Sequence, residues 1–359
     1  GNRSVSIGYE ALGTQNFTTS TDNYNVGIGY LAGNVISTGV QNTLVGGLSG
    51  DVLTDADDNV AMGYASLSSD TLGSKSTALG RSALANQNFT TATETYNVAV
   101  GYHAGISVTT GTFNTFVGSE TGDGMTTATG NTAIGAVALS AACGSDNTAV
   151  GNYALNATTG SNNTAVGQVA GFQITSGSNN LALGKDALRT GSPGGPATTD
   201  SNVVGLGDEN IASLHCQVAL TVSSDQRDKT DFVDLDLGLD FVKALNPVTY
   251  YWDKRAKYLN RDNEDGTPNG DYDLDTATPD GTHKEDWMDV GFTAQSVQAL
   301  EEAAGYKVAD KKNLTVSVNS DGKQLGLRYE KFIPILVKAI QDQDAIIQSL
   351  TARITALES

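Results

Sequence analysis

The chain has 359 residues, with 21 Lys and Arg against 40 Asp and Glu, which gives a formal net charge of −19. An acidic chain without a basic cluster argues against nucleic-acid binding, because nothing would displace the counterions of a phosphate backbone. No apolar run reaches the roughly 18 residues of a membrane-spanning helix, so we expect no membrane insertion. The chain opens at Gly1 without a Met or an apolar signal region, so we expect it to be a fragment.

Composition divides the chain into two parts. Residues 1–206 carry 5 basic and 13 acidic side chains, whereas residues 207–359 carry 16 and 27, and all six prolines lie at or after Pro193. Two cysteines do not form a disulfide framework, and three widely separated histidines do not suggest a zinc site. We therefore expect no metal and no cofactor.

The first part is a repeat, which is typical of solenoids. Each unit holds a glycine preceded by an aliphatic residue, with Asn or Ser four positions before it and a small residue three positions after it. The glycines are Gly8, Gly29, Gly46, Gly63, Gly80, Gly101, Gly118, Gly135, Gly151, Gly167 and Gly184. Four units form a longer period of 72 residues, in which Leu12, Gly33, Gly50 and Leu67 return as Leu84, Gly105, Gly122 and Leu139.

The unit predicts a parallel β-solenoid over residues 1–206. The residues three and one before each glycine point to one face of a strand and would stack on their copies in the next coil. The glycine permits a sharp corner. The recurring Asn suits a ladder in which each side-chain amide bonds its equivalents above and below.

The run Asn-Thr-Ala-Val-Gly followed by Ala-Leu, at 147–155, resembles the head repeats of trimeric autotransporter adhesins and related repeats of phage tail fibres. This resemblance implies a left-handed parallel β-roll in which three chains pack side by side, an intertwined homotrimer.

The second part predicts a small α+β domain after a connecting strand within 207–223, with the strand itself at 217–222. We expect a helix at 237–245, a strand at 248–252, an acidic loop at 260–286, a helix at 294–304 and a hairpin joining 314–318 to 325–327. Arg261 occupies the place of the first ligand of a calcium loop, so the acidic loop, which includes Asp271, is interpreted as solvated.

Residues 329–359 predict a coiled-coil helix. Ile333, Ile340, Ile347 and Ile354 fill one heptad position, and Leu336, Gln343, Leu350 and Leu357 fill the other. Ile and Leu in this arrangement favour two strands, which argues mildly against the trimer that the repeats suggest.

Four motifs in order, Ser224–Lys229, Leu245–Val248, Gly291–Gln295 and Tyr329–Ile340, resemble the endosialidase-type intramolecular chaperone domain of peptidase family S74, over 224–359. The resemblance implies a domain that ends phage tailspikes and tail fibres, helps three chains fold together and then cuts itself off. Its catalytic Ser and Lys correspond to Ser224 and Lys229.

Such a Ser–Lys pair requires a neutral amine, because only that form accepts the proton of the serine hydroxyl. A lysine pKa of about 10.4 falls when burial disfavours the charged form. Arg227 would support such a shift, whereas Asp225 and Asp228 would oppose it if they were close to the amine. We place the cut beside Ser224, preferably at Ser223–Ser224, and expect it to follow chain association.

These features predict a structural segment of a phage tail fibre or tailspike. Its partners would be its own copies and a host surface receptor or glycan, and its place would be the virion. Two alternatives remain. One is a bacterial trimeric surface adhesin. The other is a glycan-degrading tailspike whose enzyme lies upstream of Gly1, since acidic residues such as Asp51, Glu120 and Asp123 show no recurrent pairing.

Overall fold

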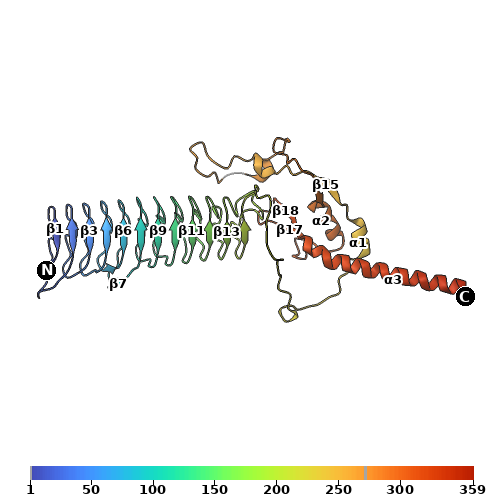
Figure 1. Cartoon of the computed structure of the whole chain (residues 1–359), viewed down its shortest axis with the longest axis horizontal. Helices are drawn as coiled ribbons and strands as arrows, with labels where there is room; N and C mark the ends of the chain where they lie inside the picture. The colour runs from blue at the N-terminus through green and yellow to red at the C-terminus, as the bar shows by residue number, and fades with distance from the viewer. Residues whose placement is uncertain (1, 271–272) are drawn as a thin grey trace. The chain divides into compact units, whose positions relative to one another are not determined.

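The computed structural model of the chain describes residues 2–270 and 273–359. Two compact units emerge, Gly1–Asn210 with Leu259–Asp273, and Ile211–Tyr258 with Leu274–Ser359. Figure 1 shows the stack of short strands in the first unit and the mixed helices and strands of the second.

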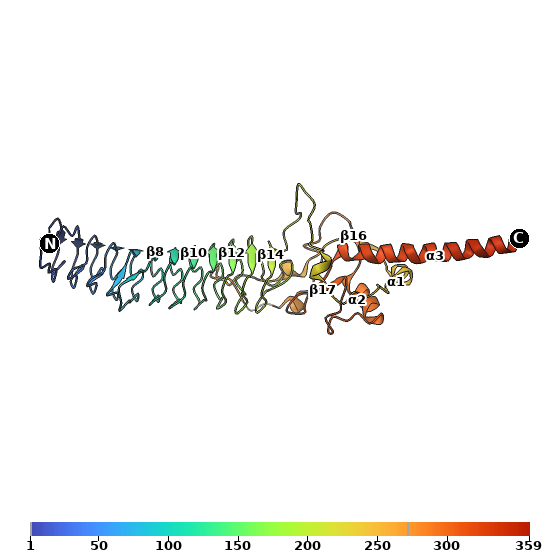
Figure 2. The same cartoon turned by 90° about the horizontal axis from the view of Figure 1, so that it is seen from below.

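The first unit is a parallel β-solenoid, as the repeat predicts. Each coil adds one three-residue strand to a twelve-stranded sheet, and successive strands are neighbours in it (Figures 1 and 2). The strands are β1 (Val5–Ile7), β2 (Val26–Ile28), β3 (Thr43–Val45), β4 (Val60–Met62), β6 (Thr77–Leu79), β8 (Val98–Val100), β9 (Thr115–Val117), β10 (Thr132–Ile134), β11 (Thr148–Val150), β12 (Thr164–Val166), β13 (Leu181–Leu183) and β14 (Val204–Leu206). The longer coils add a two-stranded sheet, β5 (Gly73–Ser74) with β7 (Thr93–Glu94).

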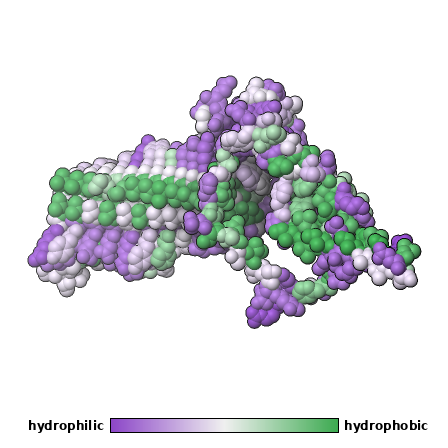
Figure 3. Space-filling model, turned by 45° about the vertical axis from the view of Figure 1, so that its right-hand side comes forward, coloured by the Kyte–Doolittle hydropathy of each residue, from purple (hydrophilic) through white to green (hydrophobic). Residues whose placement is uncertain are grey.

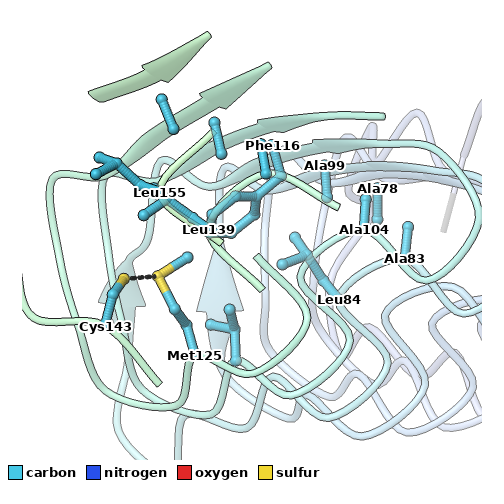
Figure 4. Packing of buried hydrophobic residues seen from close by; sticks show 14 of the residues in the cluster. Ala78, Ala83, Leu84, Ala99, Ala104, Phe116, Met125, Leu139, Cys143 and Leu155 are labelled. Atoms are coloured by element: carbon cyan, nitrogen blue, oxygen red, sulfur yellow. Dashed lines mark hydrogen bonds between the residues drawn. The ribbon is translucent and has the colours of Figure 1, made fainter. Parts of the chain in front are cut away.

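The middle residue of each strand points into the solenoid, and its two neighbours point outward. In β10, for example, Ala133 is fully buried while Ile134 is exposed. The core is therefore built from these middle residues together with Leu and Ala from the turns (Figure 4). The two outward residues do stack in register on their copies, as predicted, but stacking does not bury them.

Two coils hold a large side chain at the strand centre, and glycines make room for it. Leu44 lies between Gly33 and Gly50, where an added Cβ would approach its methyl carbons to 2.7 and 2.8 Å. Several coils with Ala at the strand centre carry Leu at the turn position instead, as Ala133 does with Leu139. Complementary volumes thus explain why Leu and Gly alternate at this position with the 72-residue period.

The repeated glycine itself is needed where coils meet. Gly63 has φ +142°, and a Cβ there would lie 2.4 Å from the carbonyl oxygen of Gly80 in the next coil. A side chain would separate the coils and break the ladder of main-chain hydrogen bonds, so this position accepts only glycine.

The buried Asn side chains form a ladder, but its main bonds differ from the predicted amide-to-amide pattern. The Asn42 main-chain N–H donates to Oδ1 of Asn25 at 2.9 Å, whereas the side-chain amide contact between them is longer, at 3.3 Å. The Asn42 side-chain amide donates instead to the Ala56 carbonyl at 2.7 Å. Each Asn therefore bonds main-chain groups that the strand sheet cannot reach.

An outward apolar face runs along the twelve-stranded sheet. It consists of the residues one and three before each glycine, and among them Ile7, Met62, Ile134, Leu183 and Val204 are each more than 40 % exposed. Figure 3 shows this face as a continuous hydrophobic band along the solenoid.

The second unit is a small α+β domain. Its elements are a 3₁₀ turn (Gln226–Asp228), α1 (Leu239–Ala244), β15 (Val248–Tyr250), β16 (Asp289–Gly291), α2 (Ala294–Ala303), β17 (Val316–Val318), β18 (Leu325–Leu327) and α3 (Phe332–Glu358), with further 3₁₀ turns at Arg255–Tyr258, Leu274–Thr276 and Tyr329–Lys331. β15 pairs antiparallel with β16, and β17 with β18. Phe241, Val297, Val316, Phe332 and Ile335 are among the residues of its core.

One prediction about the second part is wrong. Residues 217–222 form no strand, because the described chain offers them no partner, and Val218, Leu220 and Val222 are 76, 80 and 74 % exposed. The acidic loop has most of its described carboxylates exposed, as predicted, and these are Asp262, Glu264, Asp265, Asp275 and Asp280. Residues 259–270 of this loop pack in the first unit. Asp271 lies outside the described residues.

Candidate functional site

Ser224 and Lys229 lie in contact. The Lys229 amine is 2.5 Å from the Ser224 hydroxyl oxygen and 3.2 Å from the Ser224 carbonyl oxygen. The turn between them is the reason, because the 3₁₀ helix Gln226–Asp228 folds the chain back over five residues. The main-chain N–H of Lys229 closes this turn by donating to the Gln226 carbonyl at 3.1 Å.

Asp225 begins that turn and is held by Arg227. One carboxylate oxygen accepts the Arg227 main-chain N–H at 2.9 Å, and the guanidinium Nη2 lies 2.6 Å from the other oxygen. Hydrogen bonds from the Arg227 side chain, and then from its main chain, lower the pKa of Asp225. The Asp225 carboxylate therefore stays charged and accepts its hydrogen bonds from Arg227.

The structure shows how the Lys229 amine lies relative to Asp225, which the sequence spacing alone could not determine. Within the described residues, Lys229 forms no ion pair, and its hydrogen bonds go to Ser224. Asp225 therefore does not hold the amine in its charged form through an ion pair. Arg227 instead holds Asp225, a contact that the sequence pattern did not indicate.

The site is fully open to solvent in a single chain, since all residues from Thr221 to Thr230 are exposed. The single chain thus brings the two side chains together at a place that is open to water.

Among the described residues, no group of three or more His, Cys, Asp or Glu side chains is placed to hold a metal ion. No described helix has the length and hydropathy needed to cross a membrane. Asp51 and Asp123, considered above as scattered carboxylates, occupy equivalent turns 72 residues apart and are partly buried.

Comparison with known proteins identifies the segment that carries the pair. Residues 224–306 match the family model described as chaperone of endosialidase, peptidase S74. The match begins at Ser224 itself and lies directly after the solenoid and its connecting segment. No curated protein and no solved structure matches the chain.

Proposed function

We propose, on the premise that the C-terminal part of this chain belongs to the chaperone-of-endosialidase family, that the chain is a self-assembling shaft of a phage tail fibre or tailspike. The C-terminal domain brings three copies together and lets their solenoids fold side by side. It then cuts the chain next to Ser224. The shaft remains on the virion and contributes to contact with a host receptor or glycan.

The observation that carries this proposal is the uncovered apolar face of the solenoid. A continuous exposed apolar surface of this length marks an interaction site in a protein that stays in solution. Its row of Val, Ile, Leu, Met and Thr repeats with every coil. Because the face repeats with the shaft, the surface that fits it best is the same face on other copies of the chain.

Helix α3 of the second unit supports the same conclusion. Its inner side packs into the domain through Phe332, Ile335 and Ala339, which are buried. The predicted heptad side remains open, with Ile333, Ile340, Ile347 and Ile354 each more than half exposed. One helix therefore both belongs to the domain and offers a seam for association with its copies.

The Ser224–Lys229 contact supplies a chemical route for the cut. The Ser224 hydroxyl attacks the carbonyl carbon of Ser223 through a five-membered ring, and its proton passes to the neutral Lys229 amine. The Ser224 nitrogen then takes that proton from Lys229 as the C–N bond breaks, so that it leaves as a free amine and an ester joins Ser223 to the Ser224 oxygen. Water hydrolyses this ester, which leaves a carboxylate at Ser223 and the hydroxyl at Ser224.

Chain association would start this reaction by burying the pair. Surroundings provided by neighbouring copies would remove water from the amine and favour its neutral form. The cut would then wait until the shaft is assembled, and an unassembled chain would keep its chaperone domain.

Light scattering on the Ser224→Ala chain tests the assembly. We expect a mass of three chains, and a monomer or a dimer would contradict the proposal. Expression of residues 1–223 alone is a second test. We expect insoluble material, because parallel strands with exposed edges and large sequence separation fold slowly and aggregate.

A further inference from the structure

The last regular coil of the solenoid holds a buried arginine in an unusual place. Arg189 lies five residues after Gly184, where other coils have residues such as Asn34, Ser68, Ala85 and Asn156. Its side chain is 1 % exposed. The guanidinium Nη1 lies 2.6 Å from a carboxylate oxygen of Asp186, and the group also sits over the ring of Phe172, 5.5 Å from its centroid.

The other acceptors of this arginine come from a segment that follows Ser224 in the sequence. Nη2 of Arg189 donates to the carbonyl oxygens of Arg261 and Asn269, both at 2.7 Å. The segment 259–270 is folded into a narrow hairpin, since the Asn269 N–H donates to the Arg261 carbonyl at 2.7 Å. The Arg189 guanidinium therefore binds the open end of this hairpin.

Arg261 reaches back in the opposite direction. Its Nη2 lies 2.6 Å from a carboxylate oxygen of Glu209 and donates to the Thr190 carbonyl at 3.2 Å, and its Nη1 lies 3.7 Å from Asp186. The side chains of Arg261 and Glu209 are 10 and 9 % exposed. The contact is reciprocal, because each side contributes an arginine that bonds main-chain carbonyls of the other.

The hairpin supplies one charged member of this buried cluster. Arg261 lies on the hairpin, whereas Asp186, Arg189 and Glu209 belong to the shaft, as does Lys185, whose amine lies 3.8 Å from Asp186. Removing one member of a buried charge cluster leaves an uncompensated charge away from water, which is strongly unfavourable. Releasing the hairpin therefore costs free energy unless another surface pairs the same buried charges.

We propose that the hairpin 259–270 is a latch that holds the C-terminal fragment on the end of its own shaft after the chain is cut. A cut at Ser223–Ser224 places Asp186, Arg189 and Glu209 on one fragment and Arg261 on the other. Cutting the chain and losing the domain are then separate events. The inference rests on the proposed function only for the natural cut, since the latch contacts exist in the intact chain.

An added protease tests the latch without relying on self-cleavage. In the Ser224→Ala chain, the exposed residues 217–222 are replaced by the recognition sequence of a specific protease, and the cut protein is run on a size-exclusion column. We expect both fragments to elute together. With Arg261→Ala we expect the fragments to separate, and with Glu264→Ala, an exposed residue of the same hairpin, we expect them to stay together.

The uncut variants are compared first by elution volume and circular dichroism, so that a folding defect is seen before the cut. If Arg261→Ala does not fold, Arg261→Lys keeps the charge but loses the forked contacts. We expect its fragments to dissociate about tenfold faster or more. Fragments that separate without any substitution, or that stay together in both Arg261 variants, would overturn the proposal. Because an added protease makes the cut, neither result depends on whether Ser224 is a nucleophile.

Discussion

The ring of Phe116 fills the space that a side chain at Gly122 would need, since a Cβ at Gly122 would lie 2.5 Å from Cε1 of the ring. Gly105 meets the other side of the ring, where a Cβ would lie 2.8 Å from Cδ2. The coil that follows has the opposite combination, with Ala133 at the strand centre and Leu139 in the turn. Core volume is thus shared between the strand centres and the turns of neighbouring coils.

This sharing predicts a rescue between two substitutions. Phe116→Ala should lower stability by about 3–5 kcal/mol through a cavity, and Gly122→Leu by about 1–3 kcal/mol through overpacking. The double variant should recover part of the loss, because Leu has a nearly identical backbone at Leu139, with φ +51° against +62° at Gly122. Denaturation midpoints measure the coupling, and strictly additive losses would contradict it. Phe113→Ala, at an exposed ring of the same coil, is the control.

Two partly buried carboxylates predict a pH dependence of shaft stability. Burial raises the pKa of Asp51 and of Asp123, and Oδ1 of each is buried without a hydrogen-bond partner among the described residues. A raised carboxyl pKa means that the folded state prefers the neutral acid. This contribution is present at acidic pH and is lost as the pH rises through the raised pKa.

Asp51→Asn and Asp123→Asn should therefore raise the melting temperature at pH 7 and change it little near pH 3. Asn already occupies the equivalent turn at Asn34 and Asn156, so the amide fits the site. Melting curves at the two pH values provide the measurement, with the exposed Asp55→Asn as the control. An equal gain at both pH values would show that the carboxylate charge is not the cause.

The seam along α3 predicts a gain from one polar residue. Gln343 occupies a heptad position otherwise filled by Leu336, Leu350 and Leu357. Gln343→Leu should make association tighter, because a buried polar residue at the seam costs stability. Gln341→Leu adds the same side chain outside the seam and should not. Sedimentation at decreasing concentration compares them, and equal behaviour of the two variants would argue against this helix as the seam.

The chemistry of the cut depends on a base that can lose its proton. Lys229→Arg keeps a positive charge near Ser224, but a guanidinium with a pKa above about 12 stays protonated. This variant and Ser224→Ala should assemble normally and remain uncut, whereas Lys243→Arg, an exposed lysine elsewhere in the domain, should be cut like the parent chain. Gel electrophoresis after assembly distinguishes these outcomes, and a fully cut Lys229→Arg chain would remove lysine from the mechanism.

Local spacing was enough to predict much of this molecule. The repeated Gly with Asn four residues earlier predicts the solenoid, and heptads predict the free side of α3, because both patterns report neighbours at fixed sequence distances. Ser224 and Lys229 are only five residues apart, so a turn suffices to join them. The contact between Arg189 and Arg261 spans 72 residues and two different parts of the sequence, and no periodicity marks it. Its one sign in the sequence is Arg189 itself, because other coils have smaller side chains at the equivalent turn position.

The segment 217–222 shows the opposite limit. Its alternating Val218, Leu220 and Val222 predict a strand, but a strand needs a partner, and the described chain provides none. The pattern indicates that the segment can form a strand when a partner is present, and the folded single chain leaves it without regular structure and exposed.

Mass spectrometry of the assembled parent chain, recorded over time under denaturing conditions, tests whether the chain cuts itself after assembly. We expect that an intact chain is replaced by two fragments, one ending at Ser223 and one beginning at Ser224, only after trimers have formed. An assembled chain that keeps its full mass after long incubation would contradict self-cleavage. Fragments appearing at the same rate in dilute monomer would contradict its dependence on assembly.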